Sequence, residues 1–167
     1  MKTVKSVKID DLVCDDRLVY VKEGYGGRHI KHFPVVLYLQ KWDNGKVADA
    51  LTGYATYLSG LFSKYQNTPK RVGGMKTGTF NMTYKNLRLR CAGASFYDAA
   101  ILIVLQRFAL FDSIKRDGFF LDYDKNNKKQ VRVKPHGKVF KIAEGHHRVA
   151  CLYVLGYHKV PGVLIRG

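Results

Sequence analysis

The sequence Glu-Gly-His-His-Arg at residues 144–148 combines residue types that suit phosphate binding. The surrounding apolar pattern predicts a strand that ends at residue 142 and a helix over residues 146–155, so the segment contains the turn between them. A glycine in this turn lets the backbone approach a ligand closely, and the unpaired N–H groups of a helix start favour an anion. The two histidines and the arginine would add donors, and Glu144 could bind a metal ion or act as a base. The alternative is a capped core helix whose histidines only face water.

Positive charge is the second feature that could bind a ligand. The 167 residues include 29 Lys and Arg against 13 Asp and Glu, which gives a formal net charge of +16. A charge of this size favours a polyanionic partner such as nucleic acid, a nucleotide or anionic lipid. The residues expected to contact a nucleic-acid backbone lie in a glycine-rich loop and a lysine-rich hairpin: Lys70, Arg71, Arg132, Lys134, Lys138 and Lys141. A solvated surface is the alternative for both segments.

The first half of the chain must position these residues with both strands and helices. Residues 1–40 are predicted to form strands and turns, with strands at Leu18–Val21 and Val35–Leu39 because both are rich in β-branched and large apolar residues. Apolar residues recur every three or four positions over residues 46–65, which predicts a helix. Strands and helices do not alternate regularly along the chain, so the predicted class is α+β.

The second half contains clearer local signals. Ser95 and Asp98 have the spacing of a capping box and Gly118 supplies a stop, so a long helix is predicted between them. Its middle is apolar nearly all round, which predicts a buried central helix. Residues 131–142 predict a hairpin that turns at residues 135–137, with valines inward and lysines outward, and residues 160–165 predict a final strand.

Cysteine usage and hydropathy indicate the cellular compartment in which the protein is expected. The three cysteines are widely spaced and form no C-x-x-C motif, which argues against a disulfide framework and a cysteine-rich zinc site. The N-terminus lacks an apolar signal core, and the longest apolar stretch, near residues 99–111, is interrupted by Gln106 and Arg107. We therefore expect a soluble cytoplasmic protein that forms a single domain over residues 1–167.

The segment Glu144–Ile165 resembles the signature of the ParB/sulfiredoxin superfamily. In that superfamily a strand is followed by a G-x-x-R motif, a helix, a glycine and a Val-Pro strand. Phe111–Phe120 resembles the helix end that precedes the signature, and Val7–Leu18 resembles the opening strand and turn. The resemblance covers mainly residues 110–166, whereas residues 30–95 match nothing in the pattern and are expected to form an insertion.

The resemblance implies a compact mixed sheet with packed helices that binds nucleotide phosphates at the G-x-x-R helix start. The phosphate-binding residues would be Gly145, His146, His147 and Arg148. Glu144 occupies the place of an acidic residue in the kinase-like members, and Asp15 or Asp16 would lie where those members keep a carboxylate base. The implied cofactors are a nucleotide (CTP, ATP or ADP) and Mg²⁺, with Glu144 as the metal-binding residue.

Three functions remain open from the sequence. The first is a nucleotide-dependent phosphoryl-transfer or nucleotide-hydrolysing enzyme that uses Glu144 with Asp15 or Asp16. The second is a basic DNA-binding module without catalysis. The third is a ParB-like nuclease, which would need clustered carboxylates for metal. Sulfinic acid repair of the sulfiredoxin type is not expected, because His146 stands where those enzymes carry a catalytic cysteine.

Overall fold

A computed structural model describes residues 2–16, 18–65, 71–72, 75–76, 92–119 and 131–166. Its main feature is a five-stranded sheet in the order β1-β7-β5-β6-β2. The strands are β1 (Lys2–Lys8), β2 (Leu12–Val13), β5 (Arg132–His136), β6 (Val139–Glu144) and β7 (Lys159–Arg166). The sheet is mixed, because β2 runs parallel to β6 and β5 parallel to β7, while the other neighbours are antiparallel. The carboxyl ends of β2 and β6 therefore meet at the same edge of the sheet.

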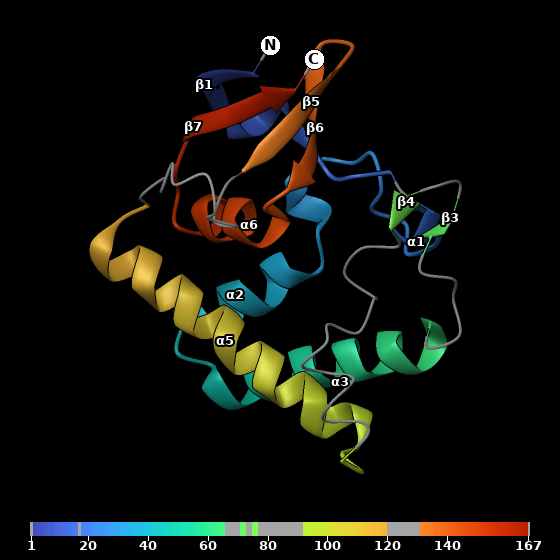
Figure 1. Ribbon diagram of the computed structural model, residues 1–167. Helices are drawn as coiled ribbons and strands as arrows, with labels where there is room; N and C mark the ends of the chain where they lie inside the picture. The colour runs from blue at the N-terminus through green and yellow to red at the C-terminus, as the bar shows by residue number, and fades with distance from the viewer. Residues whose placement is uncertain are drawn as a thin grey trace.

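Helices gather below this sheet in the view of Figure 1. The α-helices are α1 (Leu18–Lys22), α2 (Val35–Asp43), α3 (Val47–Tyr65), α5 (Phe96–Asp117) and α6 (His146–Val154). Short 3₁₀ turns, η1 (Ile9–Asp11) and η2 (Ile30–His32), and a two-stranded sheet of β3 (Arg71–Val72) and β4 (Met75–Lys76) complete the described elements. The predicted α+β class is confirmed. The described part of the chain contains no helix of the length and apolarity needed to cross a membrane.

The two strands predicted within residues 18–39 are wrong. Leu18–Val21 lies in α1 and Val35–Leu39 in α2. In α2, Val35, Val36 and Leu39 are buried, which is the spacing of one helical face and not the alternation of a strand. Packing of that face against the core outweighs the strand preference of β-branched residues.

The predictions from capping and periodicity are confirmed. The helix expected over residues 46–65 is α3, and its buried face includes Tyr54 and Leu58. Helix α5 begins at a full capping box, in which Ser95 Oγ accepts from the Asp98 amide and the Asp98 carboxylate accepts from the Ser95 amide. It ends at Gly118, whose φ of 83° lies in a region that favours glycine.

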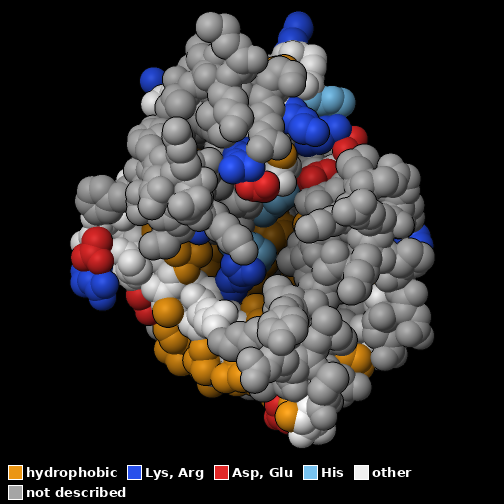
Figure 2. Space-filling view, viewed as in Figure 1, with side chains coloured by type: hydrophobic (Ala, Val, Ile, Leu, Met, Phe, Trp, Pro, Cys, Tyr) orange, Lys and Arg blue, Asp and Glu red, His pale blue; other side chains and the backbone are white. Residues whose placement is uncertain are grey.

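Helix α5 is not buried on all sides, contrary to the expectation from its composition. Its inner face includes Phe108 and Phe111, which are almost fully buried. Its outer face carries Leu102 and Leu105, which are 41% and 46% exposed. Figure 2 shows hydrophobic side chains along this part of the molecule.

The hairpin expected over residues 131–142 forms with its turn two residues later than predicted. Pro135 and His136 belong to β5, and the turn consists of Gly137 and Lys138. Val133 and Ile142 pair across the strands and are fully buried, whereas Val139 is only half-buried. The hairpin therefore contributes one apolar face to the core, as the alternation predicts.

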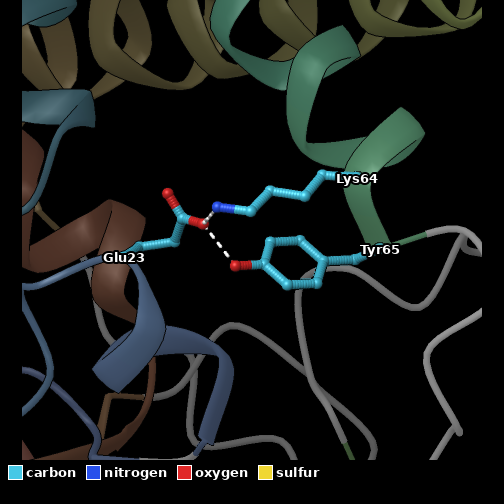
Figure 3. Close-up of polar contacts among 3 residues, drawn as sticks. All are labelled: Glu23, Lys64 and Tyr65. Atoms are coloured by element: carbon cyan, nitrogen blue, oxygen red, sulfur yellow. Dashed lines mark hydrogen bonds and ion pairs between the residues drawn. The ribbon is translucent and has the colours of Figure 1, made fainter.

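A three-residue contact ties the segment after α1 to the end of α3 (Figure 3). Lys64 Nζ donates to Glu23 Oε1 at 2.9 Å, and the Tyr65 hydroxyl donates to the same oxygen. Burial acts to raise the pKa of Glu23, but the hydrogen bonds from Tyr65 and Lys64 outweigh it and leave the pKa below its usual value. The contact holds α1 in place, and α1 carries Tyr20, whose ring stacks on that of His146.

Candidate phosphate-binding site

The site begins at the turn between β6 and α6, which consists of Gly145 alone. Gly145 has φ 95° and ψ 21°, a left-handed conformation that other residues adopt only with strain. The first bond of the helix runs from the Val149 amide to the Gly145 carbonyl, so the first-turn amides lie outside the helix's own hydrogen-bond ladder. Gly145, His147 and Arg148 are all partly exposed, so this turn reaches the surface.

His146 points inward and not toward a ligand. Its side chain is buried, and its Nε2 accepts a hydrogen bond of 3.0 Å from the Asp15 amide. The ring stacks on Tyr20 at 5.5 Å between centroids and lies 5.7 Å from the Phe33 ring. Because Nε2 acts as an acceptor, the ring is not an imidazolium in this arrangement. The structure therefore gives His146 a positioning role, which differs from the phosphate contact that the sequence predicts.

The contact of His146 also joins two distant segments. Asp15 follows β2, and 131 positions separate it from His146. The loop after β2 and the start of α6 thus lie together at the edge where β2 and β6 both end. The resemblance predicts Asp15 or Asp16 as a carboxylate base; in the structure the Asp15 residue is buried and its amide donates to His146.

His147 and Arg148 remain at the surface of the first turn. The ring of His147 lies edge-on to Phe33 at 5.4 Å. Burial lowers the pKa of His147 well below its usual value, and the nearby charges of Arg107 and Arg148 lower it further, so His147 is neutral near neutral pH. Burial and Arg107 also lower the pKa of Arg148, whose guanidinium stays protonated at neutral pH.

Asp16 is paired with a cation from the neighbouring strand. Lys141 Nζ donates to Asp16 Oδ2 at 2.6 Å, and the two side chains are 20% and 47% exposed. The hydrogen bond from Lys141 lowers the pKa of Asp16 below its usual value. Lys141 was expected to face nucleic acid, but the structure shows that this residue partly neutralises a carboxylate of the site.

Replacing Asp16 by asparagine is expected to lower the free energy of unfolding by less than about 1 kcal/mol near neutral pH, because solvent screens a half-exposed pair. The folded-state pKa of Asp16 is lowered, so this stabilisation is present above the unfolded-state pKa and is lost as the pH falls through the folded-state pKa. The difference in Tm between the wild type and Asp16→Asn should therefore shrink below about pH 4. Thermal melts across this range measure it, with Lys141→Gln as the matched variant from the other side of the pair. A difference that grows in acid would contradict the pairing.

Glu144 pairs with a residue that was also expected to face nucleic acid. Arg132 Nη1 lies 3.3 Å from Glu144 Oε1, across the β5–β6 hairpin. The Glu144 side chain is 52% exposed and directly precedes Gly145. Glu144 is thus the most accessible of the three predicted catalytic carboxylates.

The other predicted basic residues fall into two groups. Lys134 and Lys138 are exposed on the hairpin, as a nucleic-acid contact requires. Lys70 lies outside the described residues, and Arg71 is placed in β3 without a described side chain. The described hairpin therefore offers two exposed lysines in addition to the paired Arg132 and Lys141.

No three metal-ligating side chains come together within the described ranges. Cys14 and Cys151 are buried and free, and burial raises the pKa of each thiol to about 12. These two thiols are therefore unreactive at neutral pH.

Figure 2 shows a hollow near the centre of this face, where His, basic and acidic side chains lie together. Arg107 on α5 is not among the site residues predicted from the sequence, yet its charge acts on both His147 and Arg148. A signal for it exists in the sequence, because Arg107 interrupts an otherwise apolar stretch and must find a polar environment in the fold.

Comparisons with known proteins return no family model, no curated protein and no solved structure that matches this chain.

Proposed function

We propose that this chain binds the phosphate groups of a nucleotide at the first turn of α6. The observation that carries the proposal is the single-glycine passage from β6 to α6 at Gly145, next to the end of the parallel neighbour β2. Ligands of sheets with parallel strands bind outside the carboxyl ends of the strands, and a helix start favours phosphate. The half-buried guanidinium of Arg148 supplies a planar fork suited to phosphate. The resemblance of Glu144–Ile165 to the ParB/sulfiredoxin signature supports the same function.

Turnover of the nucleotide, by hydrolysis or phosphoryl transfer, is the second part of the proposal. Asp16 is a poor general base near neutral pH because its pKa is lowered, and the Asp15 residue is buried. Glu144 remains the candidate base or metal ligand, since its carboxylate is half-exposed beside the turn. Mg²⁺ is usually held by one or two carboxylates together with substrate phosphates, so Glu144 fits the ion without a cluster of protein ligands. The ion would neutralise charge on the transferred phosphoryl group.

Thermal unfolding with and without CTP, ATP and ADP in the presence of Mg²⁺ tests the proposal. A nucleotide at 100 times its Kd should stabilise the folded chain by about 2.7 kcal/mol, which raises the Tm by about 5–10 °C. Arg148→Ala should remove most of this shift, because a charge-assisted hydrogen bond contributes a factor of about 10 to 100 in affinity. Arg116→Ala is the matched control, since Arg116 is exposed and paired with Asp117. If no nucleotide shifts the Tm, the proposal fails.

A second candidate function is DNA binding through the hairpin. The net charge of +16 and the exposed Lys134 and Lys138 favour it. Duplex DNA should then bind with an affinity that falls steeply with salt, and the double variant Lys134→Gln/Lys138→Gln should reduce the salt slope by about 2. An affinity that does not respond to salt would exclude this function. The third possibility, a nuclease, gains no support from the described residues, because they hold no cluster of metal-ligating carboxylates.

A further inference from the structure

Helix α5 turns one of its long faces to solvent. The opposite face packs into the core through residues such as Val104, Phe108 and Phe111. On the solvent face the residues recur at alternating steps of four and three, which is the heptad spacing by which one helix packs against another. We call this row the α5 seam, and all six of its residues are exposed: Asp98, Leu102, Leu105, Ala109, Asp112 and Arg116.

The middle of the α5 seam is apolar. Leu102 and Leu105 are 41% and 46% exposed, and Ala109 extends the apolar surface by one turn. Single exposed leucines are common, but neighbouring leucines at the heptad spacing form a surface that a second helix can cover. Asp112 follows Ala109 along the seam, and its Oδ1 accepts from Trp42 Nε1 on α2 at 2.9 Å, so this oxygen is already bonded within the chain.

The charge of α5 favours a second copy of the chain over a polyanion. Because the chain has a formal net charge of +16, two copies repel each other overall. Helix α5 is an exception, since its three acidic residues balance its three basic residues. A second copy can therefore approach this helix without local repulsion, whereas nucleic acid gains no net attraction from it.

The two ends of the α5 seam are complementary to each other. Asp98 lies in the first turn of α5 and Arg116 in the last turn. In two antiparallel copies related by a two-fold axis, residues at equal distances from the centre face each other. A centre at position 107 places Asp98 opposite the partner's Arg116 and Leu105 opposite the partner's Ala109. The antiparallel arrangement also opposes the two helix dipoles, whereas parallel copies would bring like charges together.

Both end residues keep polar atoms for this contact. The Asp98 carboxylate accepts from the Ser95 amide through Oδ2, which leaves Oδ1 as an acceptor. Arg116 donates to Asp117 through Nε and Nη2, which leaves the two N–H groups of Nη1 as donors. An ion pair between copies therefore does not require either side chain to give up its contact within the chain.

We infer that two copies of this chain associate through antiparallel packing of their α5 seams. The contact consists of one helix pair with a short apolar middle, which is at the small end of protein interfaces. The dimer is therefore weak, with a Kd of about 10–100 µM. Gly145 and the first turn of α6 are not part of the α5 seam, so the dimer does not depend on the proposed nucleotide binding.

Sedimentation equilibrium of the full chain at physiological salt, without nucleic acid, tests the inference. The mass of the wild type should rise from that of a monomer toward twice that value between about 1 and 500 µM. Leu105→Lys should raise the Kd at least about tenfold, because it places a charge in the apolar middle of the contact. Leu37→Lys on α2 is the matched control, since Leu37 is 52% exposed and the variant adds the same charge. Thermal melts at 1 µM should show that both variants fold like the wild type.

Two results would overturn the inference. The first is a wild type that stays monomeric throughout this range, and the second is an equal loss of association in Leu105→Lys and Leu37→Lys. Association that appears only when DNA is added would also overturn it, because a polyanion would then bridge the copies. Arg148→Ala should dimerise like the wild type, which separates this contact from the phosphate site.

A double-mutant cycle tests the antiparallel register. Asp98→Asn keeps an oxygen for the Ser95 amide but removes the charge, and Arg116→Gln removes the opposite charge. Each variant should raise the Kd about two- to tenfold, because the two-fold axis repeats the pair. The double variant should lose no more than the weaker of the two single variants, since all three remove the same ion pair. Losses that multiply in the double variant would overturn this pairing of Asp98 with Arg116.

Discussion

Phe108→Ala is expected to lower the free energy of unfolding by about 3–5 kcal/mol, the range for removing a fully buried aromatic ring. Phe108 is 1% exposed, lies parallel to Trp42 with an angle of 5° between the rings, and contacts Tyr54 nearly edge-on. Trp42 cannot move easily into the space, because its Nε1 donates to Asp112 on the next turn of α5 at 2.9 Å. The cavity would therefore remain largely open.

Urea unfolding of the wild type and Phe108→Ala measures this loss, and the Tm should fall by between about 6 and 20 °C. Leu105→Ala is the control on the same helix, because Leu105 is 46% exposed and should cost less than about 1 kcal/mol. Equal losses for the two variants would contradict the packing of α5 described above.

The second large effect is expected at His146. Replacement by phenylalanine keeps an aromatic ring against Tyr20 and Phe33 but removes the acceptor for the Asp15 amide. A buried N–H left without a partner costs about 1–3 kcal/mol, and His146→Phe should lose stability by this amount. The variant should also weaken nucleotide binding, because the loop after β2 is no longer held against the start of α6.

Chemical denaturation and nucleotide titration of His146→Phe test the two expectations separately. His158→Phe serves as the control, since His158 is exposed and engages the fold through its backbone carbonyl. If His146→Phe is as stable as the wild type and binds nucleotide more weakly, His146 contacts the ligand directly and its positioning role is wrong.

Features set by neighbouring residues could be predicted from the sequence. The capping box of Ser95 and Asp98, the stop at Gly118 and the turn at Gly145 each depend on a few adjacent positions, and the structure has all of them. The sequence singled out Asp15 as a candidate carboxylate base only through a family resemblance, and it did not predict that Asp15 lies beside the start of α6.

Features set by distant residues could not be predicted. His146 and Arg148 lie in the same first turn, yet one faces the interior because the Asp15 amide, 131 positions away, requires an acceptor. Lys141 alternates with apolar residues, as an exposed strand lysine does. Its ion pair with Asp16 depends on the pairing of β2 with β6, which the local sequence does not predict. The helical state of Val35–Leu39 likewise depends on the core that buries one face of α2.

Backbone amide shifts of the ¹⁵N-labelled chain during titration with Mg²⁺ and ATP or CTP test the central claim most directly. If the first turn of α6 holds phosphate, the amides of Gly145, His147 and Arg148 should shift most, and those of Lys134 and Lys138 should change little. Saturating nucleotide that leaves the three α6 amides unmoved, or that shifts only the hairpin, would contradict the account.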